Sequence, residues 1–91
     1  MSASKSRRIE AADVVELIQR YFSFVPEDKL RTTAHLRDDL GLDSIHLVEL
    51  QVHLETAVGA RFSPLDSDFL DAFEDITSLA RYASRVAAEG D

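Results

Sequence analysis

The chain has 91 residues, a formal net charge of −7 and no cysteine. This length fits one small domain, and the missing cysteines exclude a disulfide framework, a thiolate metal site and a cysteine nucleophile. An acidic surface repels phosphate backbones, so nucleic-acid binding is not expected. The sequence contains neither an apolar run of roughly 18 residues nor a signal-peptide-like start, which predicts a cytoplasmic protein with no membrane association.

Residues 1–8 are rich in serine and basic residues and are predicted to form a disordered tail. A domain at residues 9–88 and a frayed end at residues 89–91 are expected to follow. From Glu10 to Phe24, apolar residues recur at helical spacing and acids occupy the first turns, so we predict the first helix here. Its apolar positions are Val14, Val15, Leu17, Ile18, Tyr21, Phe22 and Val25. Pro26 ends this helix because it has no N–H to donate.

Residues 27–43 are predicted to form a long loop, with a short helical turn within Glu27–Arg31. Seventeen residues without regular structure are unusual in a domain of this size. Scattered leucines can anchor such a loop to a core, and the candidates are Leu30, Leu36, Leu40 and Leu42.

Two patterns compete in residues 44–58. Apolar residues alternate as in a strand at Val48, Leu50, Val52 and Leu54. They also form two helical stripes, one at Leu47, Leu50, Leu54 and Val58 and the other at Ile45, Val48 and Val52. About 15 residues without Gly or Pro are long for a strand and ordinary for a helix. We therefore predict a helix that ends at Gly59.

The last third of the chain predicts a second loop and two helices. Residues 60–68 form the loop, with Phe62 as a core anchor. Residues 68–73 form a short helix with three apolar side chains turned inward, namely Phe69, Leu70 and Phe73. Thr77 is the expected N-cap of the last helix. Arg81 and Arg85 lie toward its C-terminal half, where they complement the helix dipole. The prediction is an all-α, four-helix bundle.

Ser44 stands just after a turn at Gly41 and at the start of the predicted helix. A serine hydroxyl there can cap the helix, because the first backbone N–H groups have no partner inside it. It also remains at the surface, and a phosphate attached to it would lie near the positive end of the helix dipole. From these residues alone, an ordinary cap and a modification site both stay open.

The segment Leu40-Gly41-Leu42-Asp43-Ser44-Ile45, followed by Val48-Glu49-Leu50, resembles the phosphopantetheine attachment motif of acyl carrier proteins. The resemblance extends from about Ile9 to Val86. It implies a four-helix bundle with a long first loop and a short third helix. It also implies a 4′-phosphopantetheine arm from coenzyme A on Ser44, with Asp43 as a flanking motif residue. The arm's thiol holds acyl groups as thioesters. The carrier is then not an enzyme, and a separate phosphopantetheinyl transferase with Mg²⁺ would supply the base and the metal.

The resemblance further implies that the helix after Ser44 contacts partner enzymes that load, condense or tailor the acyl group. The expected partner-facing residues are Ile45, His46, Val48, Glu49, Glu55, Asp71 and Glu74. Between Asp38 and Asp75 the sequence has ten acidic residues and a single basic one, Arg61. The approach of this acidic surface to basic partner surfaces should therefore be steered electrostatically. Fatty-acid carriers usually have further acids where this helix has His46, Thr56 and Ala57.

This departure argues against a housekeeping fatty-acid synthase. We predict a free-standing, monomeric carrier that delivers acyl intermediates to enzymes of a polyketide, fatty-acyl or related specialised pathway. An aryl or aminoacyl carrier of a nonribosomal peptide pathway is the close alternative. An alternative of another class is an unmodified acidic helical interaction module, in which Ser44 is only a cap.

Other chemistries fit the sequence poorly. His46 is two positions from Ser44 on a helix, so it cannot serve as its base, and no G-x-S-x-G elbow is present. His46 and His53 are seven residues apart, about 10 Å along a helix, which is too far for one metal ion. Asp66-Ser67-Asp68 is similar to the start of an EF-hand calcium loop. The match fails because the sixth position is Asp71 instead of Gly and the twelfth is Thr77 instead of Glu. Four of the five phenylalanines are expected to be core, namely Phe22, Phe62, Phe69 and Phe73, although some carriers shelter an acyl chain between helices.

Overall fold

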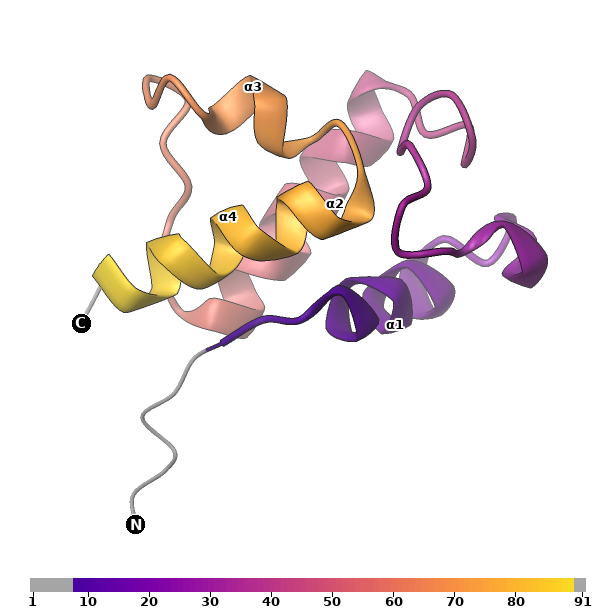
Figure 1. Ribbon diagram of the computed structural model, residues 1–91, viewed down its shortest axis with the longest axis horizontal. Coiled ribbons are helices and arrows are strands. Elements are labelled where there is room, and N and C mark those ends of the chain that lie inside the picture. Colours follow the sequence, from indigo (N-terminus) through magenta and orange to yellow (C-terminus); the bar gives the residue numbers. More distant parts are fainter. Residues whose placement is uncertain (1–7, 90–91) are drawn as a thin grey trace, which may run out of the picture.

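The computed structural model describes residues 8–89, which form four α-helices and one 3₁₀ turn (Figure 1). The elements are α1 (Ala11–Tyr21), η2 (Glu27–Lys29), α2 (Ser44–Val58), α3 (Phe69–Ala72) and α4 (Ile76–Glu89). Within this part of the chain no strand forms, and α4 packs against each of the other three helices. The predicted all-α bundle with a short third helix is confirmed.

Residues 1–7 and 90–91 lie outside the described part, so the tail predicted at residues 1–8 and the frayed end at residues 89–91 stay predictions. Glu89, which was included in that end, is the last residue of α4. None of the helices between residues 8 and 89 combines the length and the apolar character that a bilayer crossing requires.

Helix α1 is shorter than its apolar pattern predicts. It ends at Tyr21, and the chain then turns so that the Val25 N–H donates to the Phe22 carbonyl at 3.0 Å. Pro26 restricts the backbone of the residue before it, which favours an extended conformation at Val25 over further helix. Tyr21, one of the apolar positions of this pattern, has an exposed side chain, and its ring stacks on His53, with centroids 3.7 Å apart.

The first loop, residues 22–43, is attached to the turn between α3 and α4 by backbone hydrogen bonds. The Leu36 N–H donates to the Glu74 carbonyl at 3.1 Å, and the Ile76 N–H donates to the Ala34 carbonyl at 3.2 Å. Leu36, Leu40 and Leu42 are buried, as the sequence predicts. A loop of this length is stable here because its leucines contribute to the core and its backbone groups have partners.

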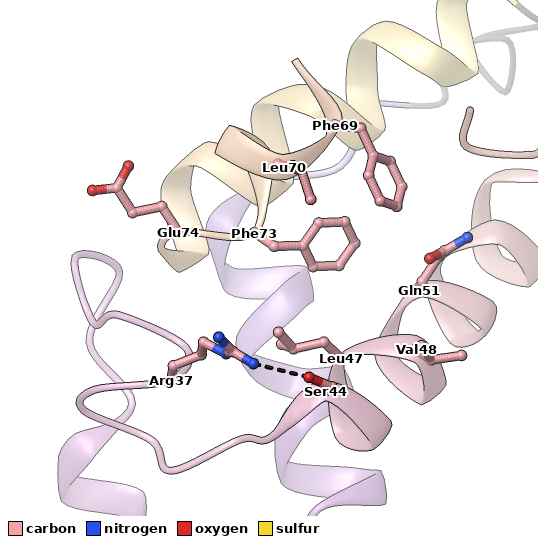
Figure 2. A pocket seen from close by; sticks show the side chains of 9 residues that line it. All are labelled: Arg37, Ser44, Leu47, Val48, Gln51, Phe69, Leu70, Phe73 and Glu74. Atoms are coloured by element: carbon pink, nitrogen blue, oxygen red, sulfur yellow. Dashed lines mark hydrogen bonds between the residues drawn. The ribbon is translucent and has the colours of Figure 1, made fainter. Parts of the chain in front are cut away.

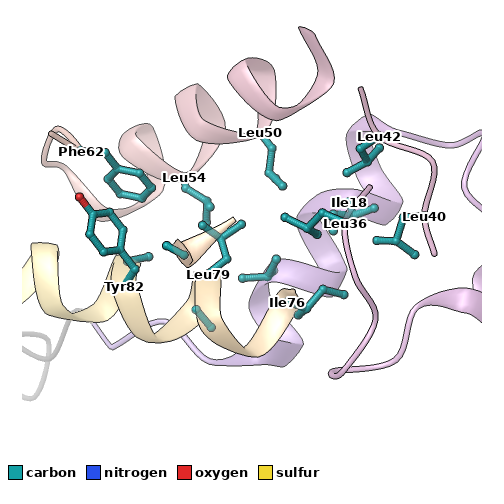
Figure 3. Packing of buried hydrophobic residues seen from close by; sticks show 14 of the residues in the cluster. Ile18, Leu36, Leu40, Leu42, Leu50, Leu54, Phe62, Ile76, Leu79 and Tyr82 are labelled. Carbon is teal, nitrogen blue, oxygen red and sulfur yellow. The ribbon is translucent and has the colours of Figure 1, made fainter. Parts of the chain in front are cut away.

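One stripe of α2 supplies the centre of the core, where Leu50 and Leu54 are fully buried (Figure 3). Leu50 and Leu54 face Ile18 of α1 and Leu79 of α4 in this view. Gly59 ends α2 in the left-handed conformation, with φ 72°. The second stripe, Ile45, Val48 and Val52, is exposed.

Two predictions about the C-terminal third are wrong. Leu70 does not turn inward: Phe69 in α3 and Phe73 directly after it pack against the core, whereas the Leu70 side chain is 80% exposed. Thr77 is not the cap of α4. The cap is Asp75, whose carboxylate accepts the Ser78 N–H at 2.8 Å, while the Thr77 hydroxyl donates to the Thr32 carbonyl of the first loop at 2.7 Å.

Candidate functional site

Ser44 is the first residue of α2, and its side chain is exposed. The N-cap is Asp43, not Ser44: the Asp43 carboxylate accepts the His46 N–H at 3.0 Å, and His46 Nδ1 accepts the Asp43 N–H at 3.2 Å. This reciprocal arrangement satisfies the start of the helix without the serine. The Ser44 hydroxyl is therefore not needed to hold the helix together, and a substituent on it would leave the cap intact.

The negative charge of the Asp43 carboxylate is stabilised by its position at the N-terminus of α2. The pKa of its carboxyl is lowered from the ordinary value, chiefly by the hydrogen bond from the His46 backbone, with smaller contributions from the Ile45 backbone and the charge of Arg37 and some opposition from burial. The carboxylate is consequently ionised at neutral pH and acts as a charged cap at the positive end of the helix dipole.

A glycine turn presents the serine. Gly41 has φ +72°, a conformation that residues with a side chain rarely adopt, and a Cβ placed there would meet nothing within 4 Å. The requirement for glycine is therefore one of backbone conformation and not of space. The Gly41 N–H donates to the Arg37 carbonyl at 3.1 Å, and the Leu42 N–H donates to the Leu36 carbonyl at 3.0 Å. The turn is thus fixed on both sides before the chain enters α2.

Arg37 is a site residue that the sequence analysis missed. Its Nη2 donates to Ser44 Oγ at 2.9 Å (Figure 2). The available signal was a single basic residue seven positions before the serine and directly before Asp38 and Asp39. Spacing across a loop cannot place a side chain, so only the fold brings Arg37 to Ser44.

A cavity of about 380 Å³ opens beside Ser44, between α2 and α3 (Figure 2). Its apolar lining comes from Leu47, Val48, Phe69, Leu70 and Phe73. Arg37 and Ser44 border it on one side, and Glu74 on another. Of the four phenylalanines predicted to be core, Phe22 and Phe62 are buried there, whereas Phe69 and Phe73 are half-buried and also line this cavity.

The residues predicted to face partners occupy different environments. Ile45 and Val48 are 69% and 59% exposed, and Glu49, Asp71 and Glu74 are exposed as well. His46 is half-buried, and its ring lies 4.9 Å from that of Phe24. The Glu55 carboxylate is occupied within the chain, because it accepts the Phe62 N–H at 2.7 Å and a Gln51 side-chain N–H at 3.3 Å.

The site presents a hydroxyl without activating it. The side-chain hydrogen bond to Ser44 comes from a guanidinium, which has no lone pair to take a proton, so Arg37 cannot act as a general base. Among residues 8–89, no three His, Cys, Asp or Glu side chains gather as a metal site would require. A hydroxyl in this setting suits modification by a separate enzyme.

Comparisons with known proteins agree with this geometry. The family model described as "Phosphopantetheine attachment site" matches residues 11–83, from the start of α1 into α4. A protein named "Acyl carrier protein" from Saccharopolyspora erythraea is 34% identical over 70 residues, which cover 71% of this chain and 74% of that protein.

The chain is a phosphopantetheine-binding domain and belongs to the acyl carrier protein family. It is a carrier and not an enzyme, and its cofactor is covalently attached 4′-phosphopantetheine. The residues fit this group, since an exposed hydroxyl stands at the start of α2 and a largely apolar cavity opens next to it. A carrier of this kind interacts with a phosphopantetheinyl transferase and with the biosynthetic enzymes that use its thioester.

Proposed function

We propose that Ser44 Oγ carries the phosphopantetheine arm, and that the chain delivers acyl thioesters to enzymes of a polyketide or related specialised pathway. The observation that carries this proposal is that the residues that cap α2 are not the residue that would be modified. Asp43 and His46 cap the helix, and the neighbouring hydroxyl is left exposed. Because Asp43 provides the cap, this geometry does not support the alternative in which Ser44 is only a cap residue.

Attachment is a phosphoryl transfer in which the transferase supplies the base and Mg²⁺. The bond from Ser44 Oγ to the β-phosphorus of coenzyme A forms, and the bond from that phosphorus to the bridging pyrophosphate oxygen breaks. Adenosine 3′,5′-bisphosphate leaves with the electron pair, and the hydroxyl proton passes to the base. The contribution of this chain is the fixed position of the hydroxyl, which lowers the entropic cost of alignment.

Partners are proposed to dock on the exposed stripe of α2. Ile45, Val48 and Val52 are each at least half exposed, and Leu70 of α3 is 80% exposed across the mouth of the cavity. Apolar side chains gathered at a surface commonly mark contacts with other proteins. Glu49, Asp71 and Glu74 add exposed negative charge on α2, on α3 and just after α3.

The composition of this surface supports a specialised pathway over a housekeeping fatty-acid pathway. Of the two acids on α2, Glu49 is exposed, while Glu55 is bonded to the second loop. A partner would then recognise the helix mainly by packing against Ile45 and Val48, with charge playing a smaller part. Monomeric state and cytoplasmic residence stay predictions.

The cavity beside Ser44 is proposed to shelter the cargo. Its volume of about 380 Å³ lies near the lower end of the range for small-molecule pockets, so it suits a short acyl group. Because Phe69 and Phe73 supply aromatic walls, an aryl cargo of a nonribosomal peptide pathway is a second candidate. Ring-proton shifts of Phe73 on loading a short acyl chain or an aryl group would separate the two.

Intact mass spectrometry after incubation with coenzyme A and a broad-specificity transferase tests the attachment. We expect the wild-type chain to gain one phosphopantetheinyl group and Ser44→Ala to gain none. Ser63→Ala is the matched control, since it removes an exposed serine hydroxyl from the second loop and should load like the wild type. A wild-type chain that gains no mass would favour the unmodified interaction module.

A further inference from the structure

Arg37 is held in place by its backbone and reaches the attachment oxygen with its side chain. Its carbonyl accepts the Gly41 N–H in the glycine turn, and it lies between two buried anchors of the first loop, Leu36 and Leu40. From this fixed base Nη2 lies 2.9 Å from Ser44 Oγ. The guanidinium therefore stands beside the hydroxyl before any modification takes place.

The charge of Arg37 is not neutralised by an ion pair. Across residues 8–89, its guanidinium makes the hydrogen bond to Ser44 and no salt bridge to a carboxylate. Arg85 shows the contrast, because it pairs with Asp66, Asp68 and Glu89. Arg37 thus keeps donors for an additional acceptor, and a guanidinium can hold phosphate oxygens in bidentate fashion.

Apart from Arg37, the start of α2 has few free hydrogen-bond donors for a phosphate on Ser44. The Asp43 carboxylate already accepts the His46 N–H, and the Ile45 N–H also interacts with it. Asp43 further brings a negative charge next to the serine. A phosphodiester on Ser44 would consequently meet repulsion from Asp43 with only part of the usual helix N-terminal donors available.

We propose that Arg37 anchors the phosphodiester of the loaded carrier, so that its guanidinium bonds a phosphate oxygen where it now bonds Ser44 Oγ. This inference rests on the proposed attachment to Ser44. The phosphorus would be bonded directly to Oγ, so a side-chain rotation of Arg37 suffices and the backbone need not move. Arg37 and Ser44 line the same cavity, and the Glu74 carboxylate points away from the hydroxyl in Figure 2. The anchored phosphate starts the arm at the mouth of that cavity.

The test compares the melting temperatures of the unloaded and loaded forms of four proteins: wild type, Arg37→Gln, Arg37→Lys and Arg61→Gln. The difference between the two forms cancels any effect of a substitution that is the same in both, and compares the phosphate contact of the loaded form with the Ser44 hydrogen bond of the unloaded form. Arg61 is the matched control, an exposed arginine of the second loop. We expect Arg37→Gln to lower the loaded-minus-unloaded difference by about 1–8 °C, the range for one exposed ion pair in a small domain. Arg37→Lys should recover part of it, and Arg61→Gln should match the wild type.

The ³¹P resonance of the loaded proteins gives a second readout that does not depend on partner enzymes. We expect the phosphodiester signal to move in Arg37→Gln, to return toward its wild-type position in Arg37→Lys and to stay in place in Arg61→Gln. Proteins that all load, with the same temperature difference and the same ³¹P shift, would overturn the role of Arg37 and leave attachment to Ser44 standing. A wild-type chain that does not load would overturn both.

Discussion

The loop before α2 and the loop before α3 are held by different interactions. The first loop places Leu36, Leu40 and Leu42 in the core and exchanges backbone hydrogen bonds with the α3–α4 turn. The second loop has one buried anchor, Phe62, and is tied to α4 by ion pairs from Arg85 to Asp66 and Asp68. Salt screens exposed ion pairs, whereas apolar burial has no charge to be screened.

This difference matches what each loop borders. The first loop carries the glycine turn, Arg37 and Asp43, and so fixes the position of Ser44. The second loop leads into α3, which forms the far wall of the cavity with Phe69 and Leu70. The first loop, which positions the attachment oxygen, is thus the more firmly packed of the two. The second loop, which leads into the α3 side of the cavity, is held by weaker contacts.

Removing an anchor of the first loop should have the largest effect on stability. Leu36 is fully buried, so Leu36→Ala should lower the free energy of unfolding by about 2–5 kcal/mol. Chemical denaturation measures this. Leu70→Ala is the control, because Leu70 is 80% exposed and its loss should leave the unfolding free energy nearly unchanged. Equal costs at the two positions would mean that the first loop is not packed as described.

Breaking the Arg85 ion pairs should loosen the second loop and leave the first in place. Hydrogen bonding to Asp68 is the main cause of the raised pKa of Arg85, which keeps the guanidinium charged at all relevant pH values. Arg85→Gln should lower the melting temperature at low salt by less than Leu36→Ala does. The loss that Arg85→Gln causes relative to the wild type should shrink near 1 M salt, where the screening length is about 3 Å. A loss that does not change with salt would instead point to the packing of Arg85 over the Tyr82 ring.

Acid should weaken the start of α2 through Asp43. Because the pKa of Asp43 is lowered in the folded protein, its contribution to stability is present above the ordinary value of 3.8 and is lost as the pH falls through the folded-state value. Carboxyl ¹³C NMR should show Asp43 titrating below 3.8, and amide exchange at His46 should quicken over the same range. Asp43→Asn, which can still cap a helix, should remove that pH dependence. An ordinary pKa for Asp43 would contradict the charged cap.

Charge reversal on the exposed acids should have the smallest effect on folding and act on partner encounter instead. Glu49→Lys should leave the melting temperature nearly unchanged and slow transfer by a cognate enzyme. Reversal at Asp71 or Glu74 should reduce the association rate more than it raises dissociation, as stopped-flow binding at two salt concentrations would show. Rates indifferent to both salt and substitution would assign recognition to Ile45 and Val48 alone.

The sequence predicts the elements better than it predicts their faces. The periodicity of α1 and α2, the glycine at the end of α2 and the leucines of the first loop all appear as expected. The two stripes of α2 look equally apolar in the sequence. The resemblance to carrier proteins predicts that Ile45 and Val48 face partners, and packing against α1 and α4 explains why the Leu50 stripe is the buried one. The orientation of Leu70 is wrong in the sequence analysis because a one-turn helix has no periodicity to orient it.

Caps and the attachment site depend on contacts that are not local. Thr77 and Ser44 are both good cap residues by type, but the caps are Asp75, two positions before Thr77, and Asp43, directly before Ser44. The Thr77 hydroxyl bonds the first loop instead. Arg37 and the cavity could not be predicted, since both arise where the first loop and α3 meet the start of α2.

The most direct test of the central claim is a ¹H–³¹P correlation spectrum of the isotope-labelled, loaded protein. A phosphodiester on Ser44 Oγ couples its phosphorus through three bonds to the Ser44 β-protons, so the attached residue is identified without mutation. The expected result is a single ³¹P signal correlated with Ser44, with the amide signals of Asp43 and His46 still those of a capped helix. A correlation with any other serine, or a loaded protein in which the start of α2 has unfolded, would contradict the account.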